Sequence, residues 1–172
     1  MMIPPSVALG IELRVLAEAE ASSAALAATA VGDYHDAATV LAFAADVDVV
    51  TFDHEHVPQD VLAALVAEGV RVHPGPHALA VAQDKTVMRE RLSAIGAPVP
   101  EWARVANAGE LGAFLAAHGG VAVVKTPRGG YDGKGVRVVR EASGADDWFA
   151  DAEQGLLVEA FVPFRRELSQ LV

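Results

Sequence analysis

One stretch decides the fold: Val121-Ala-Val-Val-Lys-Thr-Pro-Arg-Gly-Gly-Tyr-Asp-Gly-Lys-Gly-Val136. An apolar run of β type ends at Lys125, a loop with four glycines follows, and a second β-type run, 136–139, leaves the loop. Glycine adopts positive φ angles at little cost and lets the backbone approach a ligand closely. Consecutive backbone N–H groups in such a loop form a concave anion site, and lysines add positive charge for phosphate. The stretch therefore predicts a loop that binds the phosphates of a nucleotide.

The composition excludes several classes of protein. The 172 residues carry 13 basic and 23 acidic side chains, which gives a net charge of −10. A basic face supplies most of the affinity of nucleic-acid-binding proteins, so no nucleic-acid partner is expected, whereas a small anion held by local lysines is compatible with this charge. Cysteine is absent, which excludes disulfides and thiolate metal sites. We see neither a signal peptide nor an apolar run of about 18 residues, so we expect no membrane partner and a cytoplasmic protein.

The first 77 residues alternate short apolar runs with alanine-rich helical patterns, as parallel α/β units do. Asp33 or Asp36 is a candidate N-cap for one helix, and Pro58 suits the first turn of the next helix, which Gly69 ends. The predicted strands are 11–16, 47–52 and 70–72, and the predicted helices are 36–45, 58–67 and 78–94.

A second group of elements follows Gly96 and the segment 97–100, which is the predicted hinge. Strands are expected at 102–105, 121–125, 136–139 and 155–159, and helices at 108–117 and 145–152. The predicted fold class is α/β: a Rossmann-like parallel subdomain over 1–77, a connecting helix and hinge over 78–100, a small α+β subdomain over 101–160, and the start of a further subdomain over 161–172. The first strand comes late and residues 167–172 look like a strand that has just begun. We therefore expect an internal piece of a larger enzyme.

The glycine loop has a structural alternative. It joins two strands, and no Lys-Ser/Thr pair follows its glycines, so it is neither a P-loop nor a dinucleotide fingerprint. A long hairpin loop that uses glycine only for turn geometry fits the same pattern. The lysines favour phosphate binding, because the chain has only three of them, Lys85, Lys125 and Lys134, and the last two flank the glycines.

Two further segments carry candidate site residues. Residues 81–92, taken alone, predict one amphipathic helix with solvated charges, in which Lys85 matters only if folding points it at the loop. Residues 51–58 follow a strand, and ligands of open α/β sheets bind beyond the carboxyl ends of strands. Asp53, His54, Glu55 and His56 therefore lie where a polar substrate can bind, and Glu55 and His56 are the candidate contacts. Helix capping is one alternative, and a zinc site is another because His54 and His56 form a His-x-His pair beside a carboxylate.

The end of the predicted strand 155–159 is the third candidate segment. Glu159 places a carboxylate at the strand end, and Phe161 and Val162 follow it. Backbone groups there suit the Watson–Crick edge of an adenine, with apolar side chains against its faces. Glu167 suits the ribose hydroxyls.

Together these segments resemble the ATP-grasp superfamily, and within it the N5-carboxyaminoimidazole ribonucleotide synthetase family of purine biosynthesis. The resemblance covers nearly the whole chain. Four motifs in this order carry it: Thr51-Phe-Asp-His-Glu-His-Val-Pro58, Ala82-Gln-Asp-Lys-Thr-Val-Met-Arg89, Val123-Val-Lys125 with Arg128-Gly-Gly-Tyr-Asp-Gly-Lys-Gly135, and Leu157-Val-Glu159 with Arg166-Glu-Leu-Ser169.

The resemblance implies a ligase that uses ATP, Mg²⁺ and bicarbonate to carboxylate the amine of 5-aminoimidazole ribonucleotide. It implies a pre-ATP-grasp domain over 1–77 and an ATP-grasp lid over 101–160. Tyr131, Asp132 and Lys134 are its implied catalytic residues, and Glu55 and His56 are implied to bind the ribonucleotide. The residues that the resemblance assigns to ATP are Lys85, Lys125, Gly130, Gly133, Gly135, Val136, Glu159, Ala160, Phe161, Val162 and Glu167.

The family also begins with a strand and a glycine-rich turn for the ribonucleotide phosphate, and it continues past Val172 through the Mg²⁺ ligands. The resemblance therefore implies a chain without its own metal ligands that is inactive alone, and a homodimer for the complete enzyme. The alternatives are another ATP-grasp ligase (a formate-dependent ribonucleotide transformylase or a biotin-carboxylase-like enzyme) and a non-catalytic nucleotide-binding remnant.

Overall fold

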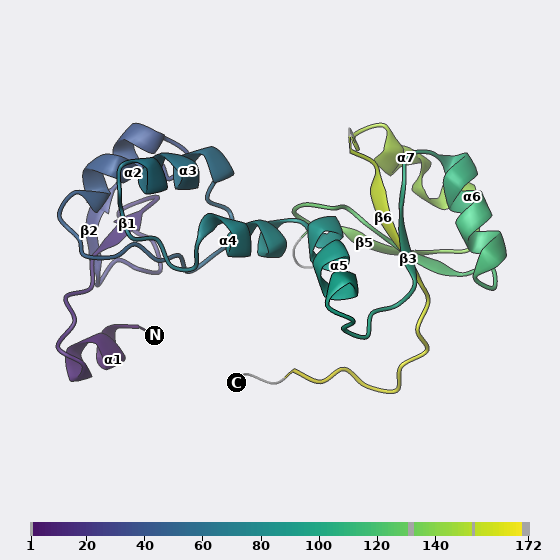
Figure 1. The fold of residues 1–172 in the computed structure, drawn as a ribbon, viewed down its shortest axis with the longest axis horizontal. Coiled ribbons are helices and arrows are strands. Elements are labelled where there is room, and N and C mark those ends of the chain that lie inside the picture. Colours follow the sequence, from purple (N-terminus) through teal and green to yellow (C-terminus); the bar gives the residue numbers. More distant parts are fainter. Residues whose placement is uncertain (1, 131–132, 153, 170–172) are drawn as a thin grey trace. The chain divides into compact units, whose positions relative to one another are not determined.

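A computed structural model of the chain describes residues 2–130, 133–152 and 154–169. The chain divides into two compact units, Met1–Ala80 and Val81–Val172, and each is described by itself (Figure 1). No helix within the described residues is long and apolar enough to cross a membrane. The finer predicted boundaries at residues 77, 100 and 160 stay predictions.

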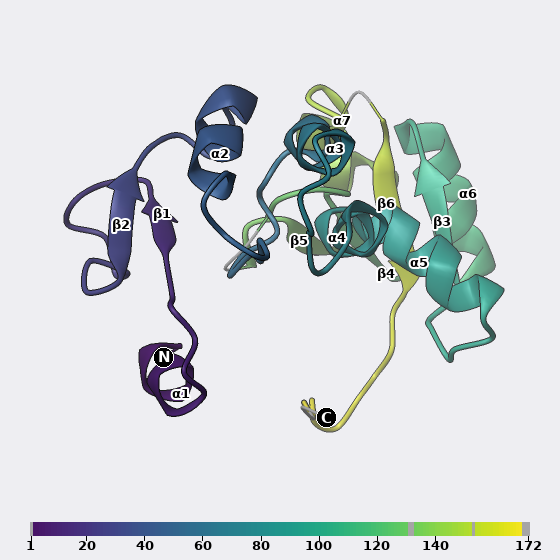
Figure 2. The same cartoon turned by 60° about the vertical axis from the view of Figure 1, so that its left-hand side comes forward.

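The first unit is built on two short pieces of parallel pairing. Strand β1 (Val15–Ala17) pairs with β2 (Ala28–Val31), and the two lie side by side in Figure 2. Val50 forms an isolated parallel bridge with Val72. The helices are α1 (Ile3–Ala8), α2 (Ala37–Ala44), α3 (Gln59–Ala67) and α4 (Pro76–Gln83), the last of which reaches into the second unit.

The core of the first unit lies between α2, α3 and the bridge. Leu62 and Leu65 of α3 are fully buried, and Val40, Val50 and Val72 pack in the same cluster. Helix α2 begins where predicted, because the Asp36 carboxylate accepts a hydrogen bond from the Thr39 amide (3.0 Å) and caps the helix.

Several predictions for the first unit were wrong. The predicted strand 11–16 is paired only from Val15, because Val15 pairs with Ala28, the first residue of its parallel partner β2, and neither β2 nor α1 was predicted. The predicted strands 47–52 and 70–72 reduce to the single bridge at Val50, since Pro74 follows and has no N–H to extend the ladder. Pro58 lies at the N-cap of α3 in an extended conformation and not in its first turn.

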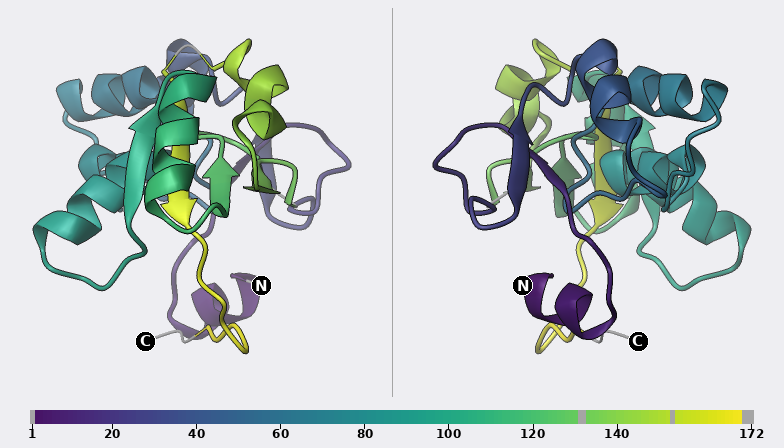
Figure 3. Two further views of the ribbon diagram at one scale, coloured as in Figure 1. Left: turned by 90° about the vertical axis from the view of Figure 1, so that its right-hand side faces the viewer. Right: turned by 90° about the vertical axis from the view of Figure 1, so that its left-hand side faces the viewer.

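The second unit is a four-stranded antiparallel sheet in the order β3-β6-β4-β5. Its strands are β3 (Trp102–Val105), β4 (Ala122–Lys125), β5 (Val136–Val139) and β6 (Leu156–Ala160), all close to their predicted positions. Helix α6 (Ala108–Ala117), which matches its prediction, covers one face of the sheet (Figure 3). Leu111 and Leu115 of α6 pack there on Val124, Leu156 and Val158.

The remaining helices of the second unit differ from their predictions. The predicted helix 78–94 is two helices, α4 and α5 (Lys85–Ala94), because Asp84 is extended (φ −129°, ψ 114°) and caps α5. The predicted helix 145–152 is a 3-10 turn, Ala142–Ala145, followed by the short α7 (Asp146–Phe149). The strand expected at 167–172 is absent from the described residues 161–169.

Candidate functional site

The glycine loop is the turn of the β4–β5 hairpin. Lys125 pairs with Val136 at the end of the ladder. Beyond this pair the Thr126 amide donates to the Gly135 carbonyl (3.0 Å), and the Gly135 amide donates to the Gly130 carbonyl (3.3 Å). The hairpin alternative is therefore correct for the backbone, and it leaves the phosphate prediction open. The predicted catalytic residues Tyr131 and Asp132 lie outside the described residues.

Two glycines let the loop narrow at its base. A Cβ atom on Gly130 would lie 2.4 Å from the Gly135 Cα, and one on Gly135 would lie 2.5 Å from the Gly130 Cα. Gly130 also has a φ of +73° and Gly133 one of +78°, which disfavour other residues. The backbone at Gly130 and the backbone at Gly135 thus pass so close to each other that a side chain on either residue would overlap the other segment. Glycine is required at Gly130 and Gly135 because a Cβ atom would overlap the facing backbone, and not only because glycine adopts positive φ angles.

The loop is tethered to the start of helix α5. The Lys85 amide donates to the Pro127 carbonyl (2.8 Å), and the Lys85 ammonium donates to the Gly129 carbonyl (2.7 Å). Arg128 Nε donates to Asp84 Oδ2 (3.1 Å). Folding therefore points Lys85 at the glycine loop, which is the condition that the sequence left open.

Asp84 joins this tether to the helix cap. Its other oxygen, Oδ1, accepts from the amides of Thr86 (2.9 Å) and Val87 (3.3 Å). Burial alone would raise the pKa of Asp84, but the hydrogen bond from Arg128 and those from the two amides outweigh burial and hold the pKa below its ordinary value. Asp84 is therefore an ionised, buried link between α5 and the loop.

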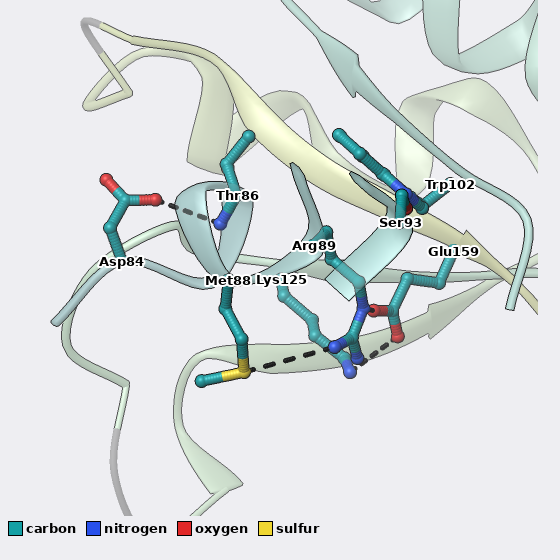
Figure 4. A network of polar contacts seen from close by, with 8 residues as sticks. All are labelled: Asp84, Thr86, Met88, Arg89, Ser93, Trp102, Lys125 and Glu159. Carbon is teal, nitrogen blue, oxygen red and sulfur yellow. Dashed lines mark hydrogen bonds and ion pairs between the residues drawn. The ribbon is translucent and has the colours of Figure 1, made fainter. Parts of the chain in front are cut away.

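Glu159 receives two cations, Lys125 and Arg89 (Figure 4). By the strand register, Glu159 lies on the sheet face opposite the one that packs on α6. Lys125 Nζ of β4 lies 2.6 Å from Glu159 Oε2, and Arg89 Nε of α5 donates to Glu159 Oε1. The Glu159 side chain is only 5% exposed. Burial alone would raise its pKa, but the hydrogen bonds from Lys125 and then Arg89 hold the pKa below the ordinary value. The sheet thus carries a buried, ionised carboxylate between two partly exposed basic side chains.

Apolar side chains border this cluster. Val136 and Val138 of β5 pair with Lys125 and Val123, so all four side chains lie on the same face as Glu159. The two β5 valines are 42% and 46% exposed. A cation beside exposed valines and a glycine loop is an arrangement that suits an anion joined to an apolar ring, such as a nucleotide.

The structure describes fewer contacts for the remaining predicted site residues of the second unit. Ala160 ends β6, and Phe161, Val162 and Glu167 lie exposed in the segment beyond it. Lys134 is exposed next to β5. The described contacts bring none of these five to the Glu159 cluster, and their roles stay predictions.

Glu55 and His56 lie in the first unit, in the turn before α3. The His54 ring lies between those of His56 and Tyr34, with centroids 5.2 Å and 5.0 Å away, and Tyr34 stacks on His35 at 4.1 Å. Among the described residues, no group of three or more His, Cys, Asp or Glu side chains is placed to hold a metal ion. The turn therefore presents an aromatic and imidazole surface, and substrate contact by Glu55 and His56 stays a prediction.

Comparison with known proteins assigns the family. A sequence model described as the ribonucleotide synthetase preATP-grasp domain matches residues 1–83, and one for the ATP-grasp domain matches residues 90–172. The curated N5-carboxyaminoimidazole ribonucleotide synthase of Mycobacterium tuberculosis is 46% identical over 173 residues, which cover 97% of this chain and 40% of that protein. The chain belongs to the N5-carboxyaminoimidazole ribonucleotide synthetase family. The family predicted from the four motifs is confirmed.

Other members of the synthetase family agree in sequence and in fold. The Corynebacterium ammoniagenes synthase is 42% identical over 177 residues, which cover 100% of this chain and 43% of that protein. The crystal structure of an ADP complex of an N5-carboxyaminoimidazole ribonucleotide synthetase matches with a TM-score of 0.82 and 28% identity, over 95% of this chain and 44% of that one. The α/β ATP-grasp fold class is confirmed, and the chain spans less than half the length of these synthetase relatives.

Three residues of the cluster and tether were not predicted as site residues: Asp84, Arg89 and Arg128. Arg89 was expected to be solvated, whereas its side chain is 16% exposed and bound to Glu159. The sequence holds two signals that were overlooked. Arg89 follows Lys85 by four residues and therefore lies on the same helix face, which is the first. Asp84 precedes a helical run in the position of an N-cap, which is the second signal.

Proposed function

We propose that the second unit supplies the phosphate- and adenine-binding half of the ATP site of an N5-carboxyaminoimidazole ribonucleotide synthetase. The observation that carries the proposal is the ion cluster of Lys125 and Glu159 at the base of a tethered glycine loop. Family membership supports it, and so does the similarity to a synthetase that was crystallised with ADP. The complete enzyme would carboxylate the amine of 5-aminoimidazole ribonucleotide at the expense of ATP and bicarbonate.

The described residues suit the binding side of this chemistry. Transfer of a phosphoryl group depends mostly on positioning and on neutralising charge, which a lysine and loop amides supply. We propose that Lys125 contacts a phosphate of the nucleotide and that the exposed valines of β5 pack on an adenine face. Tyr131, Asp132 and Lys134 are proposed to face bicarbonate and the ribonucleotide amine, and Glu55 and His56 to contact the ribonucleotide.

We expect the Mg²⁺ ligands of the complete enzyme to lie outside this chain. The described residues contain no group of three or more His, Cys, Asp or Glu side chains placed to hold a metal ion, so we derive no step through Mg²⁺ from this chain. The 172 residues alone are therefore expected to give no turnover with ATP, bicarbonate and 5-aminoimidazole ribonucleotide. Turnover at the rate of a complete synthetase would contradict that expectation. The cytoplasmic location and the homodimer stay predictions.

A chimera tests the proposed activity. In it, this chain replaces the matching segment of the Mycobacterium tuberculosis synthase, with which it shares 46% identity. We expect ADP release that depends on 5-aminoimidazole ribonucleotide and not on formate or biotin, and that is lost in Lys125→Met but kept in Arg140→Met, an exposed control in the same unit. A folded chimera whose ADP release is indifferent to the ribonucleotide would refute the proposed substrate.

A further inference from the structure

The Glu159 cluster holds more positive charge than its carboxylate needs. Arg89 takes one oxygen and Lys125 the other, so one negative charge faces two positive ones. A buried carboxylate with no cationic partner is strongly disfavoured, whereas one partner is enough to offset its charge. One of the two cations can therefore leave Glu159 without uncovering an unpaired charge.

The two cations differ in how easily they can move. Arg89 projects from helix α5, its guanidinium lies 4.0 Å from the Met88 sulfur, and its planar group is suited to a fixed carboxylate. Lys125 ends β4, directly before the glycine loop, and it carries a compact ammonium on a flexible stem of four carbons. The Lys125 side chain is also slightly more exposed, at 21% against 16%. Lys125 is therefore the partner that can leave Glu159, and Arg89 is the partner that stays bound to it.

We propose that Arg89 is a positioning residue, which holds Glu159 so that the Lys125 ammonium can exchange between Glu159 and a phosphate oxygen of a nucleotide. The inference rests on the proposed nucleotide site and adds to it a residue outside the predicted ATP-binding set. Without Arg89, the departure of Lys125 would leave the Glu159 carboxylate buried and alone. Lys125 would then stay bound to Glu159, and the site would lose its surplus positive charge.

The scarcity of lysine makes the exchange directly measurable. Lysine-selective ¹⁵N labelling of the chain yields side-chain NMR signals from Lys85, Lys125 and Lys134 only. The rate at which the Lys125 ammonium exchanges hydrogen with water is measured without ligand, and its shift is then followed during titration with ADP. Adenosine, which has no phosphate, is the ligand control.

Four variants separate the possible roles of Arg89. Arg89→Met removes the charge, Arg89→Lys keeps it and adds one lysine signal that its absence from the wild-type spectrum identifies, and Arg91→Met removes an exposed charge from the same helix as a matched control. The double variant Arg89→Met with Glu159→Gln also removes the carboxylate through which Arg89 acts. Tryptophan fluorescence checks folding, because both tryptophans lie in this unit.

In Arg89→Met we expect the Lys125 exchange rate and the ADP affinity to fall about tenfold or more, which corresponds to 1.4 kcal/mol. Arg89→Lys and Arg91→Met are expected to stay near the wild type, and the double variant to regain fast exchange. The inference is overturned if Arg89→Met and Arg91→Met give the same Lys125 exchange rate. It is also overturned if the double variant exchanges as slowly as Arg89→Met. If the wild-type chain does not respond to ADP, the proposed nucleotide site fails, whereas the ligand-free exchange rates still decide the role of Arg89.

Discussion

Alanine substitutions at three loop glycines separate backbone strain from steric overlap. At Gly133 an added Cβ meets nothing within 4 Å, so Gly133→Ala tests only the cost of a φ of +78°. At Gly135 the φ is not positive, but the Cβ would lie 2.5 Å from the Gly130 Cα and from the Thr126 hydroxyl. At Gly130 both costs apply, since φ is +73° and the Gly135 Cα would be 2.4 Å away. The three variants therefore form a matched series.

The magnitudes follow from these two costs. A left-handed conformation costs a non-glycine residue about 1–2 kcal/mol, and the loss of unfolded-state freedom offsets about 0.4–1 kcal/mol of that. Overlap with a backbone atom cannot be relieved by a rotamer change, and overpacking costs about 1–3 kcal/mol. We expect the free energy of unfolding to fall by about 1 kcal/mol in Gly133→Ala, about 2 in Gly135→Ala and about 3 in Gly130→Ala.

Urea unfolding followed by the fluorescence of Trp102 and Trp148 measures these losses, because both tryptophans belong to the second unit. With a urea m-value of about 1 kcal/mol/M, the midpoint falls by about 1, 2 and 3 M in this order. The reasoning is refuted if Gly135→Ala is as stable as the wild type, or if Gly133→Ala is the most destabilised of the three.

The same urea assay checks three further expectations. Glu159→Gln should lower the free energy of unfolding by about 3 kcal/mol, because two cations lose their buried partner; a loss below about 1 kcal/mol contradicts the cluster. Because the pKa values of Asp84 and Glu159 are lowered on folding, their stabilisation is complete above about pH 5 and is lost as pH falls through the folded values. The urea midpoint should therefore drop on acidification, and less so in Asp84→Asn. Asn107→Ala removes a cap that accepts from the Glu110 amide (3.0 Å) and should cost about 1 kcal/mol, whereas Glu141→Ala, which removes no such cap bond, should cost under about 0.5 kcal/mol.

Local signals predicted most of the second unit. Helix α6 and strand β3 were predicted with their observed bounds, since Gly119 stops the helix and short apolar runs form the strands. The Asn107 cap at the start of α6 was not predicted. In the first unit, the length of each strand depends on its partner, which periodicity does not reveal. The predicted strand 11–16 begins only at Val15 for that reason.

The candidate site likewise contains residues that local sequence signals predict and residues that depend on tertiary packing. The glycine loop and Lys125 were predicted from spacing and from the scarcity of lysine, because both are properties of the sequence itself. The partners of Glu159 depend on which helix face meets the sheet, which is a tertiary property. The helical pattern therefore predicts a solvated charge at Arg89, although Arg89 lies four residues after Lys85 on the same helix face and is bound to Glu159.

Titration of the lysine-labelled chain with ADP, adenosine and pyrophosphate tests the nucleotide site most directly. The proposed site predicts that ADP shifts the Lys125 ammonium signal, that pyrophosphate shifts it less at equal concentration, and that adenosine leaves it unchanged. The Lys125→Met variant should bind ADP more weakly than Arg140→Met. A Lys125 signal that stays unshifted up to the highest soluble concentration of ADP would contradict the proposed nucleotide site.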